Sequence, residues 1–288
     1  MMKIYVTGYW EDDESLLKTI KKYAFGKSSW KNLEFTAKPN FDKVVVLNHC
    51  NSNSLNFPPE KAVYFRLEPP GSLNYLESSE SYIVPGFMHW PLLHKFPEEN
   101  LYKIYKDHEI KKKRLFSTVT SDLAYMDGHV ERLILIHLLD KSISGGFDVY
   151  GRKTKNKYFE SINAYKGELQ NKYEGLLKYQ YHLAVENSFI NDYFTEKISD
   201  PILSECLCFY AGCSNIEEYI DARAFFKISL VNKEEAKDTI IKAIQDNQWK
   251  KRLKYIKQQK LRLLTDLNPL NLIWLAVNEG DYVKEIKL

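Results

Sequence analysis

Apolar and polar positions in the first hundred residues follow two patterns. Residues 14–25 carry apolar side chains three and four positions apart, which is the spacing of an amphipathic helix. Other segments are short apolar runs bounded by polar residues, which is typical of strands buried in a parallel sheet. Strands that alternate with helices predict a first α/β unit. Its predicted strands are residues 3–8, 44–47 and 62–67.

The same alternation returns after residue 114 and predicts a second α/β unit. The polar, basic residues 91–114 lie between the two units, and we interpret them as a solvent-exposed linker, with a phosphate-binding patch as the less favoured alternative. Residues 234–264 keep apolar positions at helical spacing, so we expect one long helix there. The predicted strands of this unit are residues 115–119, 147–152, 179–185, 206–210 and 224–230, and its shorter helices are residues 130–139 and 215–220.

Composition excludes few classes of protein. The formal net charge is +3 with 27% charged residues, so the chain is not basic enough to predict nucleic-acid binding. The opening residues lack the long apolar run of a signal peptide or membrane anchor, which predicts a cytoplasmic protein. The four cysteines lack metal-ligand spacing, and we expect buried thiols in a reducing compartment. They are Cys50, Cys206, Cys208 and Cys213.

One stretch, residues 179–197, combines a strand pattern with two polar clusters. Its apolar first part ends in Glu-Asn-Ser at residues 186–188, and open α/β sheets bind ligands at the carboxyl ends of their strands. Thr-Glu-Lys follows at residues 195–197, directly before an apolar segment, as at the start of a helix. Because the N–H groups at a helix start attract phosphate, the stretch indicates a site for a phosphorylated ligand.

Pro201 leaves the course of this predicted helix open. If one helix ran from Thr195 through Cys206, the proline would remove an internal hydrogen bond at a cost of about 3 kcal/mol. Alternatively, Asp200 caps a helix that has Pro201 in its first position. The first arrangement keeps residues 195–197 at a helix start, where they can bind phosphate. The second would loosen that phosphate-binding geometry.

Residues 179–197 resemble the donor-sugar signature of the family 10 glycosyltransferases, the α-1,3/α-1,4-fucosyltransferases. The chain departs from that signature at Gln180, Val185 and Phe194. The positions that match it are Glu186, Asn187, Ser188, Tyr193, Thr195, Glu196 and Lys197.

The resemblance extends over most of residues 115–230. The strand and turn at residues 115–121, followed by Arg132, are similar to a family element, although Asp122 stands where the family usually has Asn or Cys. Tyr150 lies in an Asp-x-Tyr-Gly element that also matches. The first hundred residues are similar to the family only in outline.

The resemblance implies a GT-B fold, in which two Rossmann-like domains face each other across a cleft and C-terminal helices close the structure. We expect an N-terminal, acceptor-side domain at residues 1–110 and a donor-binding domain at residues 111–265. Residues 266–288 would form a helical tail that packs back on the N-terminal domain. The implied activity is inverting transfer of L-fucose from GDP-fucose to a hydroxyl of a glycan acceptor, without a metal or another cofactor.

The resemblance also implies roles for single residues. Arg132 and Lys197 would contact the diphosphate of the donor, where fixed cations stabilise the charge that the leaving group gains. Glu196 would accept hydrogen bonds from the ribose, although a carboxylate at a helix start also complements the helix dipole. Glu186 would lie near the fucose. The other donor-binding positions would be Tyr150, Asn187, Ser188, Tyr193 and Thr195.

The catalytic base of the family is a glutamate of the N-terminal domain, between a strand and a proline-containing loop. Glu68 meets this description, and its carboxylate would take the proton of the acceptor hydroxyl. Glu77 and Glu80 are its competitors. His89 could contact a sugar or act as an alternative base, but a single histidine beside aromatic residues is more often a packed side chain.

Three alternatives stay open at this stage. The fold could serve another nucleotide-sugar donor, because the N-terminal similarity is weak. The chain could also be a non-catalytic module that binds a nucleotide or sugar. Finally, the basic residues 250–262 could contact an anionic membrane, although a solvent-exposed helix face is the commoner explanation.

Overall fold

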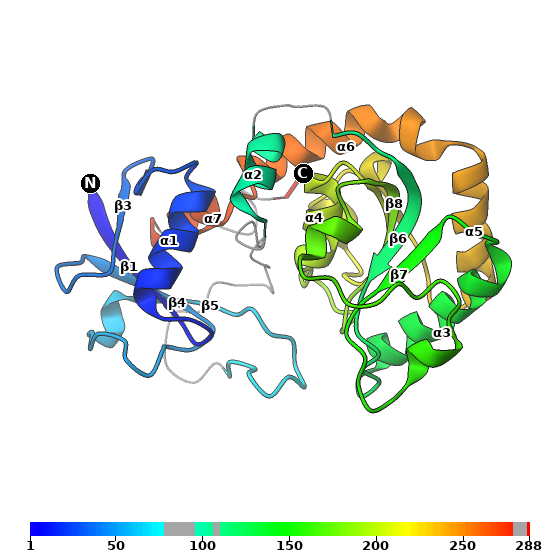
Figure 1. Ribbon diagram of the computed structural model, residues 1–288. Coiled ribbons are helices and arrows are strands. Elements are labelled where there is room, and N and C mark those ends of the chain that lie inside the picture. Colours follow the sequence, from blue (N-terminus) through cyan, green and yellow to red (C-terminus); the bar gives the residue numbers. More distant parts are fainter. Residues whose placement is uncertain (78–95, 106–109, 279–286) are drawn as a thin grey trace. The chain divides into compact units, whose positions relative to one another are not determined.

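The computed structural model describes residues 1–77, 96–105, 110–278 and 287–288. The chain divides into two compact units. Unit 1 contains Met1–His94 and Arg262–Leu288, and unit 2 contains Lys95–Leu261. Each unit has its own five-stranded sheet (Figure 1).

The sheet of unit 1 has the strand order β2-β3-β1-β4-β5. Its strands pair in parallel, except that β2 runs antiparallel to β3. The sequence pattern did not predict β2 and β3, whose residues are largely polar or only partly buried. The strands are β1 (Met2–Gly8), β2 (Ser29–Trp30), β3 (Leu33–Thr36), β4 (Lys43–Leu47) and β5 (Ala62–Phe65).

In the described part of unit 1, the helices α1 (Asp13–Tyr23) and α7 (Pro269–Val277) accompany the sheet. The backbone N–H of Ser15 donates to the side chain of Asp12 at 3.0 Å, so Asp12 caps the start of α1. The side-chain amide of Asn268, which precedes α7, donates to the carbonyl of Tyr23 at 3.1 Å. This contact joins the end of α1 to the start of α7, from opposite ends of the chain.

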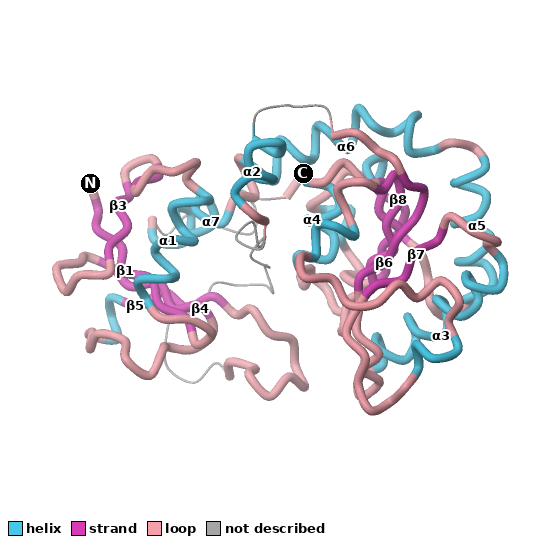
Figure 2. The backbone as a smooth tube through the Cα atoms, in the orientation of Figure 1, coloured by secondary structure: helices cyan, strands magenta, loops and turns pink. Residues whose placement is uncertain are grey.

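The sheet of unit 2 is entirely parallel, with the order β10-β9-β8-β6-β7. Its central strand β8 is almost completely buried, because helices cover both faces. Helices α3 and α5 lie on one side of the sheet and α4 lies on the other (Figures 1 and 2). The strands are β6 (Arg114–Val119), β7 (Phe147–Tyr150), β8 (Tyr179–Val185), β9 (Leu207–Ala211) and β10 (Phe225–Lys227).

The helices of unit 2 correct one prediction. Residues 234–264 form two helices, α5 (Lys233–Gln245) and α6 (Gln248–Leu264), instead of one. Asn247 separates them with a φ of 50°, a left-handed conformation that asparagine tolerates better than most residues. The remaining α-helices are α2 (Glu98–Tyr105), α3 (Asp127–Ser142) and α4 (Glu196–Leu203), and the predicted helix at residues 215–220 is a short 3₁₀ turn, Ile216–Glu218.

The sequence pattern predicts a solvent-exposed linker at residues 91–114, and for the described part of this segment that prediction is wrong. It contains α2, which buries Leu101 and Ile104. It also contains Lys112, whose ammonium group donates to the carbonyl of Leu177 at 3.1 Å, to the carbonyl of Ser204 and, at 3.6 Å, to the sulfur of Cys206. The polar character of these residues therefore reflects internal hydrogen bonds as well as exposure.

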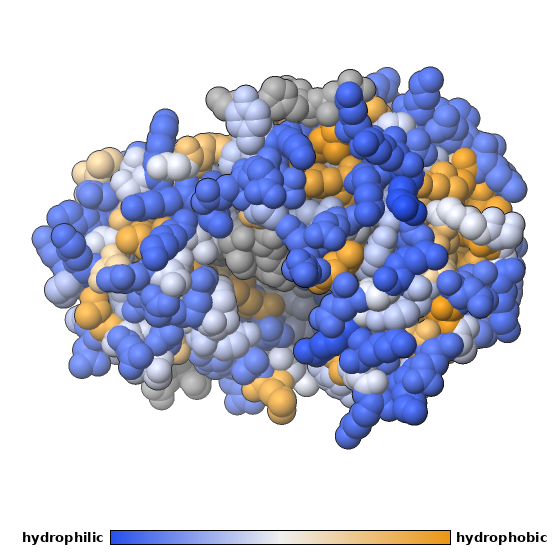
Figure 3. Space-filling model, in the orientation of Figure 1, coloured by the Kyte–Doolittle hydropathy of each residue, from blue (hydrophilic) through white to orange (hydrophobic). Residues whose placement is uncertain are grey.

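Hydrophilic residues cover most of the face shown in Figure 3. On α6, several of the basic residues at 250–262 have partners, for example Lys260, which is buried against Glu205 at 2.9 Å. The exposed lysines of this helix are Lys250, Lys251, Lys254 and Lys257. Among the described residues, no helix is long and apolar enough to span a membrane. Cys50 is exposed, contrary to the prediction, whereas Cys206, Cys208 and Cys213 are buried.

Candidate functional site

A buried carboxylate, Glu186, lies directly after the end of β8. Its backbone N–H donates to the carbonyl of Ala211 at 2.8 Å, which continues the pairing of β8 with β9. Its carboxylate accepts from the N–H of Thr195 at 2.8 Å and from the hydroxyl of Thr195 at 2.7 Å. The ammonium of Lys197 at 3.2 Å and the hydroxyl of Tyr210 at 3.3 Å donate as well. These donors offset the cost of burying the charge.

Helix α4 begins where the sequence predicted it. Thr195 is its N-cap, and the N–H of Lys197 donates to the hydroxyl of Thr195 at 3.2 Å. The helix continues through Pro201, as in the first of the two predicted arrangements, but it ends at Leu203 and not at Cys206. Asp200 lies inside the helix and does not cap it. The two polar clusters of the signature are therefore joined by the contact of Glu186 with Thr195 and Lys197.

Lys172 also reaches this region, and the sequence analysis missed it. Its ammonium lies 2.6 Å from the carboxylate of Asp200 and 3.7 Å from that of Glu196. Burial lowers its pKa, but Asp200 and Glu196 raise it by more, so the pKa is above its usual value. Lys172 is therefore a permanent cation held by α4.

A third cation, Arg132, comes from α3. The first turn of α3 packs so closely on the end of β8 that a Cβ on Gly128 would lie 2.2 Å from the carbonyl oxygen of Glu186. This close approach brings the guanidinium of Arg132 to the side chain of Asn187 at 3.4 Å and to the carbonyl of Ser121 at 3.1 Å. Arg132 is buried, and burial lowers its pKa to about 10, so it remains charged at neutral pH.

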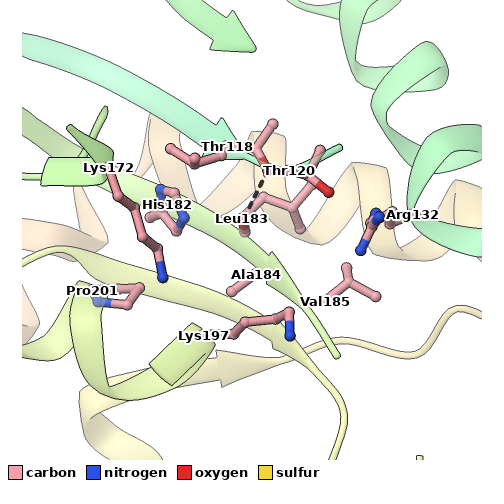
Figure 4. Close-up of a pocket in the computed structure, with 11 residues that line it drawn as sticks. Thr118, Thr120, Arg132, Lys172, His182, Leu183, Ala184, Val185, Lys197 and Pro201 are labelled. Carbon is pink, nitrogen blue, oxygen red and sulfur yellow. Dashed lines mark hydrogen bonds between the residues drawn. The ribbon is translucent and has the colours of Figure 1, made fainter. Parts of the chain in front are cut away.

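These cations line a cavity of about 20 Å³ between the ends of β6 and β8. Figure 4 shows Lys172 and Lys197 on the α4 side, whereas Arg132 approaches from α3 beyond the end of the strand. A space of this size holds no more than a water molecule. A larger anion would therefore bind at the mouth of the cavity, near the charged ends of Arg132, Lys172 and Lys197.

Two histidines near the cavity stay neutral. Burial, together with Lys172 and Lys112, lowers the pKa of His182 to about 3. The hydroxyl of Ser117 donates to the carbonyl of Gly175 at 2.6 Å, so it accepts from Nδ1 of His182 at 2.9 Å. Nε2 of His182 is then an acceptor.

His129, on α3, is the second neutral histidine. Burial and the nearby Arg132 lower its pKa to about 4. Its Nε2 donates to the side-chain oxygen of Asn187 at 3.1 Å, which is the same atom that Arg132 contacts. His129 and Arg132 together therefore fix the orientation of Asn187.

The structure does not bring every predicted donor residue together. Tyr150 is buried, and its hydroxyl is hydrogen-bonded at 2.9 Å to that of Tyr179, the first residue of β8. Tyr179 in turn donates to Asp148 at 2.7 Å. Tyr150 ends β7 at the carboxyl edge of the sheet, but its hydroxyl belongs to a network at the first residue of β8, away from Glu186. Tyr193 is buried and Ser188 is partly exposed.

In unit 1, Glu68 lies three residues after the end of β5, at the carboxyl edge of the sheet. It is partly exposed, and the hydroxyl of Tyr9 donates to its carboxylate at 3.2 Å. Burial and then Glu68 raise the pKa of Tyr9 to about 12, so Tyr9 remains a donor at neutral pH. Glu77 is exposed, whereas Glu80 and His89 lie outside the described residues.

Chemically, unit 2 offers three cations, a helix N-terminus and adjacent carboxylates at the carboxyl edge of a parallel sheet. Such a set suits a diphosphate, because the cations bind its oxygens and the carboxylates accept hydrogen bonds from hydroxyl groups. Unit 1 offers a carboxylate that solvent reaches, which suits the transfer of a proton.

Residues 110–264 match the model of the C-terminal part of glycosyltransferase family 10 (fucosyltransferase). Among solved structures, an α1,3-fucosyltransferase is similar over 88% of this chain and 81% of its own, with 20% identity and a TM-score of 0.51. This chain has the GT-B fold, as does this α1,3-fucosyltransferase. A mutant of S. aureus TarM in complex with UDP is similar over 82% of this chain and 56% of its own, with 10% identity and a TM-score of 0.50.

Proposed function

Because this chain belongs to glycosyltransferase family 10, the fucosyltransferases, we propose that it transfers L-fucose from GDP-fucose to a hydroxyl of a glycan, with inversion at the anomeric carbon. The observation that carries the proposal is the joining of Glu186, Thr195 and Lys197 at the start of α4, beside Arg132. These are the residues through which the chain resembles the family's donor signature.

On the donor side, we assign the diphosphate to Arg132 and Lys197. The leaving GDP gains negative charge as the bond to fucose breaks, and fixed cations stabilise that charge most in the transition state. Arg132 presents a planar fork to two oxygens and Lys197 acts as a point charge. Lys172 is paired with Asp200 and adds to the positive potential at the diphosphate. The ribose hydroxyls would donate to Glu196.

Glu186 has a supporting role in this proposal, instead of the direct fucose contact that the resemblance suggested. It is fully buried, and its oxygens already accept from Thr195, Lys197 and Tyr210. It therefore holds Lys197 and the start of α4 in place. When the donor binds, Lys197 can contact a phosphate oxygen by a small change of its side chain, because that side chain is partly exposed.

On the acceptor side, we assign the base to Glu68. Inversion requires the acceptor hydroxyl to attack from the face opposite the leaving diphosphate, and a carboxylate takes up its proton during the attack. Tyr9 orients Glu68 through its hydroxyl. We expect no divalent metal in this reaction, because Arg132, Lys172 and Lys197 supply the positive charge that a metal would supply elsewhere.

Calorimetric titration of the purified protein with GDP-fucose, GDP, GDP-mannose and UDP, each with and without EDTA, tests the proposal. Selective binding of GDP and GDP-fucose that EDTA does not change is the expected result. Preference for UDP would assign another donor. If the protein binds GDP but releases no GDP from GDP-fucose with any oligosaccharide acceptor, the result would instead support a non-catalytic module.

A further inference from the structure

A further cavity of unit 2, of about 380 Å³, lies between α3 and the 3₁₀ turn Tyr158–Ser161. We call it the α3 groove. Most of its lining residues are apolar, and three of the large side chains are exposed, Val130 by 37%, Ile134 by 42% and Tyr158 by 48%. Exposed apolar and aromatic side chains that gather at one cavity mark a binding surface.

Helix α3 has apolar residues on both of its faces. Leu135 and Leu139 are completely buried, whereas Val130 and Ile134, which are one helical turn apart, line the α3 groove. A helix that is apolar all round is normally covered on every side. The exposed face of α3 therefore fits an apolar partner that the described part of this chain does not supply.

The loop that leads into the groove is strongly basic. Four of the six residues 152–157 are cationic, and all four are exposed. One of them, Lys153, lies over the ring of Tyr165 at 5.0 Å. For the other three, the described residues supply no ion-pair partner. The four cations are Arg152, Lys153, Lys155 and Lys157.

Asp122 holds this basic loop in a defined position. Its buried carboxylate accepts from the N–H of Thr154 at 2.6 Å, and its carbonyl accepts from the side-chain amide of Asn156 at 3.1 Å. The lysines alternate with these two anchored residues along the chain and remain exposed. The loop therefore presents its charge to solvent from a fixed backbone, next to the groove that begins at Tyr158.

The carboxylates of α3 and of the 3₁₀ turn do not cancel this charge. Glu131 is paired with Lys233, and the carboxylate of Asp140 accepts from two backbone N–H groups. Asp127 and Glu160 are exposed, but the four cations of the basic loop outnumber them. This part of the surface therefore attracts anions.

We propose that the α3 groove and the basic loop together form a docking surface for a membrane that carries anionic lipids. A cluster of four lysines and arginines attracts the phosphate groups of such lipids, and a neighbouring apolar surface adds to the contact by reaching the acyl region below them. Tyrosine is enriched at the boundary between these two layers, and Tyr158 directly follows the loop. The inference goes beyond the proposed function, because it depends neither on the donor nor on the transfer.

Co-sedimentation with vesicles tests the inference, with phosphatidylcholine alone and with an equal mixture of phosphatidylcholine and phosphatidylglycerol. Wild type should bind the mixed vesicles more tightly than the neutral ones, and high salt should weaken that binding. The double variant Lys155→Gln/Lys157→Gln should lose about 30-fold in affinity for the mixed vesicles. Ile134→Ser should lose about fivefold at low and at high salt.

Two variants serve as matched controls. Lys250→Gln/Lys254→Gln removes two exposed cations from α6, the other candidate membrane contact, and Val231→Ser removes an exposed apolar side chain outside the groove. Both should bind the mixed vesicles as wild type does. A Tm within error of the wild-type value in each variant separates loss of docking from loss of folding.

Failure of wild type to bind the mixed vesicles would overturn the inference. Loss of binding in the α6 variant, with normal binding in the loop and groove variants, would overturn it as well. Binding of a poly-glutamate peptide through Lys155 and Lys157, without binding of vesicles, would assign the surface to an acidic protein partner and would also rule out the membrane.

Discussion

The two sheets present glutamates at their carboxyl edges in opposite states. Glu186 of unit 2 is fully buried and accepts hydrogen bonds from a backbone N–H, two hydroxyl groups and an ammonium group. Glu68 of unit 1 is partly exposed and accepts from the hydroxyl of Tyr9. The first is fixed in place by its neighbours, whereas water can reach the second.

This difference in burial suits the two glutamates to different roles, one in binding the diphosphate and the other in proton transfer. A group that holds cations for a diphosphate acts best when it is fixed and desolvated, because its interactions then need no reorganisation when the ligand binds. A base has to gain and lose a proton in each cycle, so it must exchange that proton with solvent or substrate. The comparison therefore predicts that changes in unit 2 affect donor binding and that changes at Glu68 affect transfer.

The largest expected effect comes from Glu68→Gln, which keeps the size of the side chain and removes the base. Transfer to an oligosaccharide acceptor found by screening should fall by about 10³-fold. GDP affinity should stay within the error of calorimetry. Glu60→Gln, at an exposed position of unit 1, is the matched control. Full activity of the Glu68 variant would move the role of base to another residue, with Glu77 and Glu80 as the next to test.

Lys197→Met should have the second largest effect. It removes a cation from the donor site and leaves the carboxylate of Glu186 buried without its ion-pair partner. GDP affinity should fall by about 100-fold and Tm should fall as well. Lys250→Met, at an exposed position on α6, should change neither. Unchanged GDP affinity in Lys197→Met would contradict the assignment of the diphosphate.

A smaller effect should appear as pH dependence of stability. The pKa of His182 is about 3 in the folded protein and about 6.5 in the unfolded chain, so the folded state binds fewer protons between these values. The stability that the folded protein has with His182 neutral is therefore full above pH 6.5 and is lost as the pH falls below that value. Between pH 6.5 and pH 5 the free energy of unfolding should fall by roughly 1 to 2 kcal/mol because of this group.

Urea unfolding of wild type and His182→Gln at these two pH values measures this contribution. The variant should be less stable at neutral pH, because Ser117 loses its imidazole partner. Its stability should nevertheless fall less than that of wild type between pH 6.5 and pH 5. Equal losses in the two proteins would show that His182 does not stay neutral.

Tyr9→Phe should have the smallest effect. It removes the hydroxyl that orients Glu68, and a neutral hydrogen-bond donor contributes about 1 kcal/mol, which corresponds to about fivefold in rate. The loss should appear in kcat, with unchanged affinity for GDP. Tyr158→Phe, at an exposed tyrosine of unit 2, is the control. A loss of GDP affinity in Tyr9→Phe would contradict the division of work between the two units.

Much of the fold was predictable because its signals are local. The buried strands are apolar runs, and the start of α4 carries the threonine cap and the first-turn glutamate that favour a helix start. The break between α5 and α6 also had a local signal, since Asp246 and Asn247 together are typical of a helix end. Apolar positions at helical spacing on both sides of the break nevertheless predicted one continuous helix.

The part of the site that was missed depends on contacts between distant positions. Lys172 lies in a polar segment with no motif of its own, and its partner Asp200 is 28 positions away. The neutral state of His182 likewise results from burial beside Lys172 and Lys112, which a strand pattern does not reveal. In contrast, Glu186 and Lys197 were found because they belong to one continuous stretch of sequence.

Lys112 has a consequence for synthesis of the chain on the ribosome. Its ammonium group is bonded to groups that lie 65, 92 and 94 positions further along the chain. A buried ammonium without such partners would be strongly unfavourable. The segment that leads into β6 therefore cannot settle in its final place until Cys206 has left the ribosome. Unit 2 should accordingly remain sensitive to protease during translation until most of it has emerged, and should then fold in one step.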